Sequence, residues 1–98
     1  MEIPALAQLM GAYLHQDFDV VGSVDDNIDL FVRRSSALAA SLPQEVAWLL
    51  EEKRIEDAEL EAILDDMGCA VAPPEDMSYR TWLAEIAEHV RSAVSTGD

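Results

Sequence analysis

Two pairs of glutamates have a spacing that could hold a divalent cation. Glu56 and Glu59 form one Glu-x-x-Glu pair, and Glu85 and Glu88 form the other. Residues three apart share one face of a helix, so two such helices could present carboxylates to Mg²⁺ beside a nucleotide phosphate, as in all-helical nucleotide pyrophosphatases. However, the second pair falls outside the apolar stripe of its helix and should face solvent. A Mg²⁺-dependent pyrophosphatase is therefore the least favoured alternative.

Other residues that could do chemistry are few. Cys69 is the only cysteine, which excludes an intramolecular disulfide, and its apolar neighbours predict a buried thiol and not a nucleophile. The two histidines, His15 and His89, are too few for most histidine-based metal sites. The sequence also has no glycine-rich phosphate loop and no Ser-His-Asp series in a recognisable context. We therefore expect no enzymatic activity, no cofactor and no metal ion.

The charge balance limits the class of partner. The chain has 98 residues, with 20 Asp and Glu against 6 Lys and Arg, and its formal net charge is −14. Such a charge repels nucleic-acid phosphates and anionic lipid headgroups, so we expect neither nucleic acid nor membrane as a partner. The same charge accelerates encounter with a basic protein, such as a nuclease that carries positive charge for its own substrate. The alternative is that the charge only keeps the domain soluble.

Length and hydropathy predict one domain over residues 1–98, with a frayed tail over 95–98. Half of the residues are hydrophobic, which is enough for one compact core. No run approaches the roughly 18 apolar residues that cross a bilayer, and the amino terminus lacks the pattern of a signal peptide. We therefore expect a cytoplasmic protein.

The spacing of apolar residues predicts an all-α fold, a compact bundle of about five short helices. The expected helices cover about 4–15, 23–36, 41–50, 56–67 and 78–94. Ser23 and Ser78 should cap the second and the last of them, and Gly68 should end the fourth. Pro73 and Pro74 predict an extended loop before the last helix.

The acidic residues gather in two stretches, each a candidate binding surface. Between residues 17 and 29 there are five aspartates and no base. This stretch is the preferred surface for pairing with Lys and Arg of a basic partner, through Asp17, Asp19, Asp25, Asp26 and Asp29. The second candidate surface is made of Glu51, Glu52, Asp65 and Asp66. His15 is expected to interact with the last carbonyls of the first helix, and direct contact with a partner is its alternative role.

Several motifs resemble those of one protein family. Residues 11–19 (GAYLHQDFD) place an aromatic residue, then His-Gln-Asp and a second aromatic residue, at the end of the first helix. The similarity continues through residues 24–28 (VDDNI), 64–69 (LDDMGC), the two prolines at 73–74, and 78–83 (SYRTWL). In this pattern, which spans about residues 6–90, the chain resembles the immunity proteins of bacterial contact-dependent growth inhibition.

The resemblance implies a cytoplasmic protein that performs no chemistry. Such a protein binds the C-terminal toxin domain delivered by a neighbouring cell, often a nuclease, and covers its active site or substrate surface. We expect a monomer that forms a one-to-one complex with a basic toxin domain. A general acidic protein–protein interaction module is the main alternative.

Overall fold

Every regular element in the described part of the chain is helical. The computed structural model describes residues 3–14, 20, 22–52 and 55–96, and no strand occurs within these ranges. The predicted all-α class is therefore confirmed. The structure places the helices close to the predicted ranges, so the apolar spacing was a sound guide to their positions.

The first helix combines an α-helical and a π-helical part. Helix α1 (Pro4–Gln8) begins with a proline, whose fixed φ and missing N–H suit the first turn, and continues into the π-helical turn η1 (Leu9–Tyr13). The helix ends at Tyr13, two residues before the predicted end. Its apolar stripe is buried as expected, namely Leu6, Leu9, Met10 and the following Leu14.

Helix α2 (Val24–Arg34) begins with a capping box. The Asp26 N–H donates to Ser23 Oγ at 3.1 Å, and the Ser23 N–H donates to Asp26 Oδ2 at 3.0 Å. The two side chains thus satisfy two backbone donors that have no partner inside the helix. The predicted cap at Ser23 is confirmed. A short helix, α3 (Ser36–Ala39), follows α2.

The middle of the chain forms two further helices. Helix α4 (Leu42–Ala47) continues into the π-helical turn η3 (Trp48–Glu52), and helix α5 (Asp57–Asp66) follows. Gly68 ends α5 as predicted, with a φ of +93° that a side chain would strain. The Gly68 N–H donates to the Asp65 carbonyl and the Cys69 N–H to the Leu64 carbonyl, each at 3.0 Å. This pattern is a Schellman motif.

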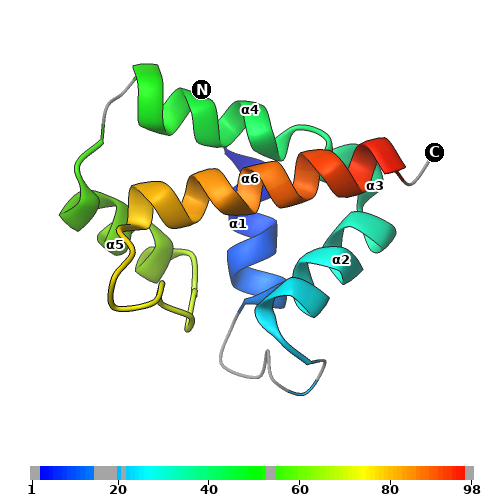
Figure 1. Cartoon of the computed structure of the whole chain (residues 1–98), viewed down its shortest axis with the longest axis horizontal. Helices are drawn as coiled ribbons and strands as arrows, with labels where there is room; N and C mark the ends of the chain where they lie inside the picture. The colour runs from blue at the N-terminus through cyan, green and yellow to red at the C-terminus, as the bar shows by residue number, and fades with distance from the viewer. Residues whose placement is uncertain (1–2, 15–19, 21, 53–54, 97–98) are drawn as a thin grey trace.

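Helix α6 (Tyr79–Thr96) crosses the molecule and contacts α2, α3, α4 and α5. In Figure 1 it lies between α4 on one side and α2 on the other. Ser78 Oγ accepts the Thr81 N–H at 3.1 Å, so the predicted cap is confirmed. Ser95 and Thr96, expected in a frayed tail, belong to this helix. Among the described residues, no helix is both long and apolar enough to cross a membrane.

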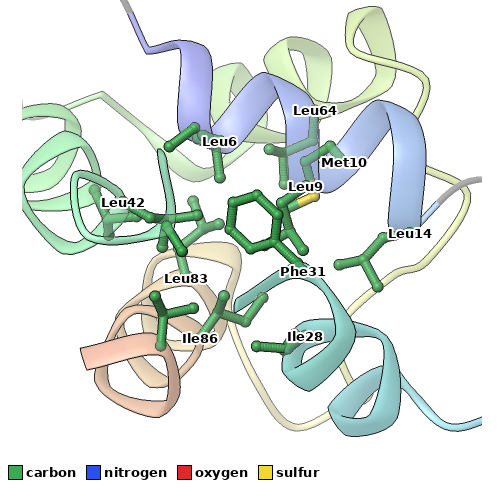
Figure 2. Close-up of a cluster of buried hydrophobic side chains, with 14 of the residues drawn as sticks. Leu6, Leu9, Met10, Leu14, Ile28, Phe31, Leu42, Leu64, Leu83 and Ile86 are labelled. Atoms are coloured by element: carbon green, nitrogen blue, oxygen red, sulfur yellow. The ribbon is translucent and has the colours of Figure 1, made fainter. Parts of the chain in front are cut away.

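Side chains from α1, η1, α2, α4, α5 and α6 meet in one hydrophobic core. Phe31 of α2 is fully buried near the centre of this cluster in Figure 2, and its ring packs edge-on against Tyr13 at 5.4 Å between centroids. The radius of gyration is 12.4 Å, against about 13 Å expected for a compact domain of this length. The predicted stripes supply most of this core, including Ile28, Val32, Leu60, Leu64, Leu83, Ile86 and Val90.

Among the described residues, Glu45 of α4 is the charged side chain that is buried, with 2% of its surface exposed. Its Oε2 accepts the Ala5 N–H at 3.1 Å, and its Oε1 accepts the Leu6 N–H at 2.9 Å. These are the first two N–H groups of α1, because Pro4 has none. The carboxylate of α4 therefore caps α1, at the helix end where the dipole favours negative charge.

Candidate functional site

Two aspartates of α2 meet a histidine of α6 on the surface between these helices. Asp25 and Asp29 are one helical turn apart and share a face of α2. His89 places Nε2 2.8 Å from Asp29 Oδ1 and Nδ1 3.5 Å from Asp25 Oδ1. The side chains of Asp25 and Asp29 are still 77% and 52% exposed. Glu85 is exposed on α6, one turn before His89. We call Asp25, Asp29, Glu85 and His89 together the α2–α6 acidic face.

Asp26 has a structural role at the start of α2. The sequence grouped it with Asp25 and Asp29 as a residue that binds a partner. Its side chain is exposed, but its carboxylate accepts the Ser23 N–H and completes the cap of α2. A substitution of Asp26 would therefore change helix stability as well as surface charge. The acidic face is better tested at Asp25 and Asp29.

A groove with an apolar floor adjoins the acidic face. It has a volume of about 530 Å³ and lies between α2, α6 and the loop over residues 69–77. Asp25, Glu85 and His89 stand at its edge. The floor consists of Val24, Ile28, Val71, Ala72, Pro74, Met77, Trp82 and Ile86. We call this feature the α2–α6 groove.

The second predicted surface is divided between the two ends of α5. Glu51 lies beside Asp57 at the start of this helix, whereas Asp65 and Asp66 lie at its end. Asp66 lies nine positions after Asp57 in this helix, which corresponds to a rise of about 14 Å. All four predicted residues, including Glu52, are exposed. The pair at 51–52 and the pair at 65–66 therefore lie apart.

Arg80 uses its donors inside the fold. Its Nη1 donates to the Ile55 carbonyl at 2.9 Å and its Nη2 to the Leu50 carbonyl at 2.7 Å. The Arg80 N–H donates to Asp57 Oδ1 at 3.1 Å. This half-buried cation thus holds the start of α6 against the end of η3 and the start of α5.

The two Glu-x-x-Glu pairs are exposed. Glu88 is paired with Arg91 on α6, and this hydrogen bond raises the pKa of the arginine. Glu85 belongs to the acidic face, and Glu56 and Glu59 lie on the outer side of α5 and its cap. In the described ranges, no group of three or more His, Cys, Asp or Glu side chains is placed to hold a metal ion.

The sequence did not indicate the role of His89. We considered it only as one of two histidines, too few for most histidine-based metal sites, and its aspartate partners lie 60 or more residues earlier in the chain. The local signal was the spacing of Asp25 and Asp29, which sets two carboxylates on one helix face. Three other predicted site residues, His15, Asp17 and Asp19, lie outside the described residues.

Cys69 is half-buried beside the turn that ends α5, less than the full burial that we predicted. Burial raises the pKa of its thiol. The thiol donates a hydrogen bond to the Val71 carbonyl over 3.2 Å, which favours its protonated form, and the negative charge of Asp65 raises the pKa further. The net effect is a raised pKa, so the thiol is protonated at neutral pH and is a weak nucleophile.

We expect iodoacetamide to alkylate Cys69 several times more slowly in the folded chain than in the chain unfolded in urea, both at pH 8. The thiolate is the reactive form, and a raised pKa lowers its fraction at this pH. The rate in the folded chain should continue to rise when the pH is increased beyond the range in which the unfolded chain levels off. Mass spectrometry of timed samples measures both rates. Equal rates at pH 8 would contradict the environment described for the thiol.

Comparison with protein families identifies the family of this chain. A family model described as CdiI immunity protein matches residues 2–90, a range that contains the whole α2–α6 acidic face and groove. Comparisons with curated proteins and with solved structures gave no significant match. The family match confirms the resemblance noted in the sequence. Because it covers far more than half of the chain, this protein belongs to the CdiI immunity protein family.

Proposed function

We propose that this chain neutralises a basic toxin domain through the α2–α6 acidic face. A CdiI immunity protein binds the cognate toxin of a contact-dependent growth inhibition system, and immunity proteins are generally not enzymes. The proposed toxin is a nuclease, because nucleases carry positive charge for their own substrates. In the proposal, one chain covers one toxin domain in the cytoplasm of the protected cell.

The observation that carries the proposal is the pair of exposed carboxylates on either side of His89. Asp25 and Asp29 present exposed carboxylates one turn apart on one helix face, which suits Lys or Arg side chains of a partner. Their contacts with His89 restrict the two side chains before any partner arrives. Binding then orders fewer groups, and the loss of side-chain entropy is smaller.

The net charge supports the same surface. A charge of −14 on 98 residues creates a long-range field that attracts a basic protein. On α2 the nearest bases, Arg33 and Arg34, lie in the last turn, at the opposite end of the helix from Asp25. The face is therefore most negative around Asp25 and Glu85, whereas Arg33 lies one turn after Asp29 on α2.

The test measures association of the chain with the C-terminal domain of the toxin encoded immediately upstream of its gene. The variant carries Asp25→Asn and Asp29→Asn, and Asp26 is kept so that the cap of α2 survives. We expect the association rate at low salt to fall about tenfold, and its dependence on salt to become weaker. Surface plasmon resonance at two salt concentrations measures both quantities.

The matched control carries Asp65→Asn and Asp66→Asn, which removes the same charge at the end of α5. Its association rate should stay within about threefold of the unchanged chain, because these residues lie away from the proposed surface. If this control slows association more than the variant at 25 and 29, the toxin binds near the end of α5 and the proposal for the α2–α6 acidic face is wrong. In cells that make the toxin domain, the unchanged chain should restore growth. Absence of binding and of protection would refute the proposed function itself.

A further inference from the structure

We infer that the α2–α6 groove receives an apolar side chain of the toxin that is flanked by Lys or Arg. This inference rests on the proposed function and names the contact that decides which toxin is bound. The acidic face alone attracts any basic protein, whereas a shaped apolar groove accepts only a partner with a matching side chain.

The floor of the groove is apolar surface that the fold leaves partly open. Val24, Val71 and Met77 are half-buried, and Ala72 is exposed. Trp82 also lines the groove and is 7% exposed. Covering such surface is favourable by roughly 25 cal/mol for each Å² removed from water. A side chain placed here would complete the packing between α2, α6 and the loop.

The wall of the groove formed by residues 69–77 is fixed by the fold. The Ala70 N–H donates to the Leu14 carbonyl at 2.9 Å, and the Met77 N–H donates to the Pro74 carbonyl at 2.9 Å. Pro73 precedes Pro74, and two consecutive prolines restrict the backbone further. The groove is thus shaped before the partner binds, which reduces the entropy cost of binding.

The charges at the edge of the groove select its occupant. Asp25 and Glu85 stand beside the apolar floor, and Asp29 lies one turn further along α2. An apolar side chain with Lys or Arg next to it would place its cations against these carboxylates. A second copy of this chain would bring another net charge of −14, and a nucleic acid would bring phosphates, so both are repelled from this edge.

The two features therefore act on different steps of binding. Charges at the surface raise the rate of encounter, and a filled apolar pocket lowers the rate of dissociation. Variants of the acidic face and of the groove should accordingly change different rate constants. This separation makes the groove testable independently of the proposed function.

The test is Ala72→Phe, which places a ring in the groove and competes with the side chain of the toxin. Ala72 is exposed in a loop, so the fold should tolerate the change. With the toxin domain described above, we expect the dissociation rate to rise about tenfold or more, and the association rate to change less than threefold. Surface plasmon resonance gives both rates, and circular dichroism checks the fold.

The matched control is Ala37→Phe, at an alanine that is also exposed and lies in α3, beyond the far end of α2. It should leave both rates unchanged. If Ala72→Phe loses its folded spectrum, Val24→Ala replaces it, with an expected rise in dissociation rate of about threefold. An unchanged dissociation rate in a folded groove variant would contradict the inference that the groove receives a side chain of the toxin. The proposed function would still stand if the Asp25 and Asp29 variant slows association. If the unchanged chain does not bind the toxin domain, both proposals fail.

Discussion

Replacing Glu45 by alanine is expected to lower the free energy of unfolding by about 3 kcal/mol. The change leaves the N–H groups of Ala5 and Leu6 without their acceptor at the buried start of α1. Each unsatisfied buried donor costs about 1–3 kcal/mol, and the shorter side chain also leaves a cavity. Urea unfolding followed by circular dichroism, with linear extrapolation to water, measures the loss.

Gln44→Ala provides the control, because this residue is the exposed neighbour of Glu45 on the same helix. Its effect should stay within about 0.5 kcal/mol. Glu45→Gln should give an intermediate loss, since the amide keeps one acceptor oxygen but turns an NH₂ group toward a backbone donor. A loss of less than about 1 kcal/mol for Glu45→Ala would mean that α1 does not depend on this carboxylate.

A second large loss is expected from Gly11→Ala in η1. Within a helix this change usually stabilises a protein by about 0.5–1 kcal/mol, because glycine has the more flexible unfolded chain. Here a Cβ would lie 2.8 Å from the Met67 carbonyl oxygen, and a backbone atom cannot rotate away. We therefore expect the opposite sign, a loss of about 2 kcal/mol in the same unfolding experiment.

The control for Gly11 is Ala12→Gly, at the exposed neighbouring position of η1. It should cost up to about 1 kcal/mol, as in an ordinary helix. Adding a methyl group at position 11 and removing one at position 12 should thus both destabilise the protein. A gain of stability for Gly11→Ala would show that η1 does not approach the end of α5 this closely.

Much of the fold could be predicted because its signals are local. Ser23 and Ser78 precede apolar stripes at the spacing of a helix, and Gly68 follows one, so caps and boundaries could be inferred from a few neighbouring residues. The end of the first helix was predicted two residues too late, at residue 15 instead of Tyr13. There the helix becomes π-helical before it ends, and no residue pattern distinguishes that turn from an α-helical one.

Contacts between distant residues could not be predicted in the same way. Glu45 accepts hydrogen bonds from residues about 40 positions earlier, and His89 meets an aspartate 60 positions earlier. Glu45 did leave one trace in the sequence. It follows Leu42 by three residues and adjoins Val46, so it occupies a core position of its helix, where an acid requires a partner.

The candidate site was predictable in its chemistry but not in its shape. The aspartates of α2 were proposed because they lie in a stretch, residues 17–29, that has five aspartates and no base. The groove beside them is built by three segments far apart in the chain, and only the tertiary fold shows that Val24, Val71 and Trp82 share one floor. The sequence also grouped Glu51 with Asp65, but Glu51 lies in η3 beside the start of α5, whereas Asp65 lies near the end of α5.

Because α6 packs across the earlier helices, the chain can complete its fold only after this last helix has been synthesised. This helix supplies Leu83, Ile86 and Val90 to the core and is synthesised after every element that it contacts. At about 5–20 residues per second, a ribosome needs roughly 5–20 s to reach the end of α6. Until then the earlier helices lack one wall of their core. A cell is therefore protected by the finished molecules it holds when the toxin arrives, and new translation replenishes that stock only after a delay of this order.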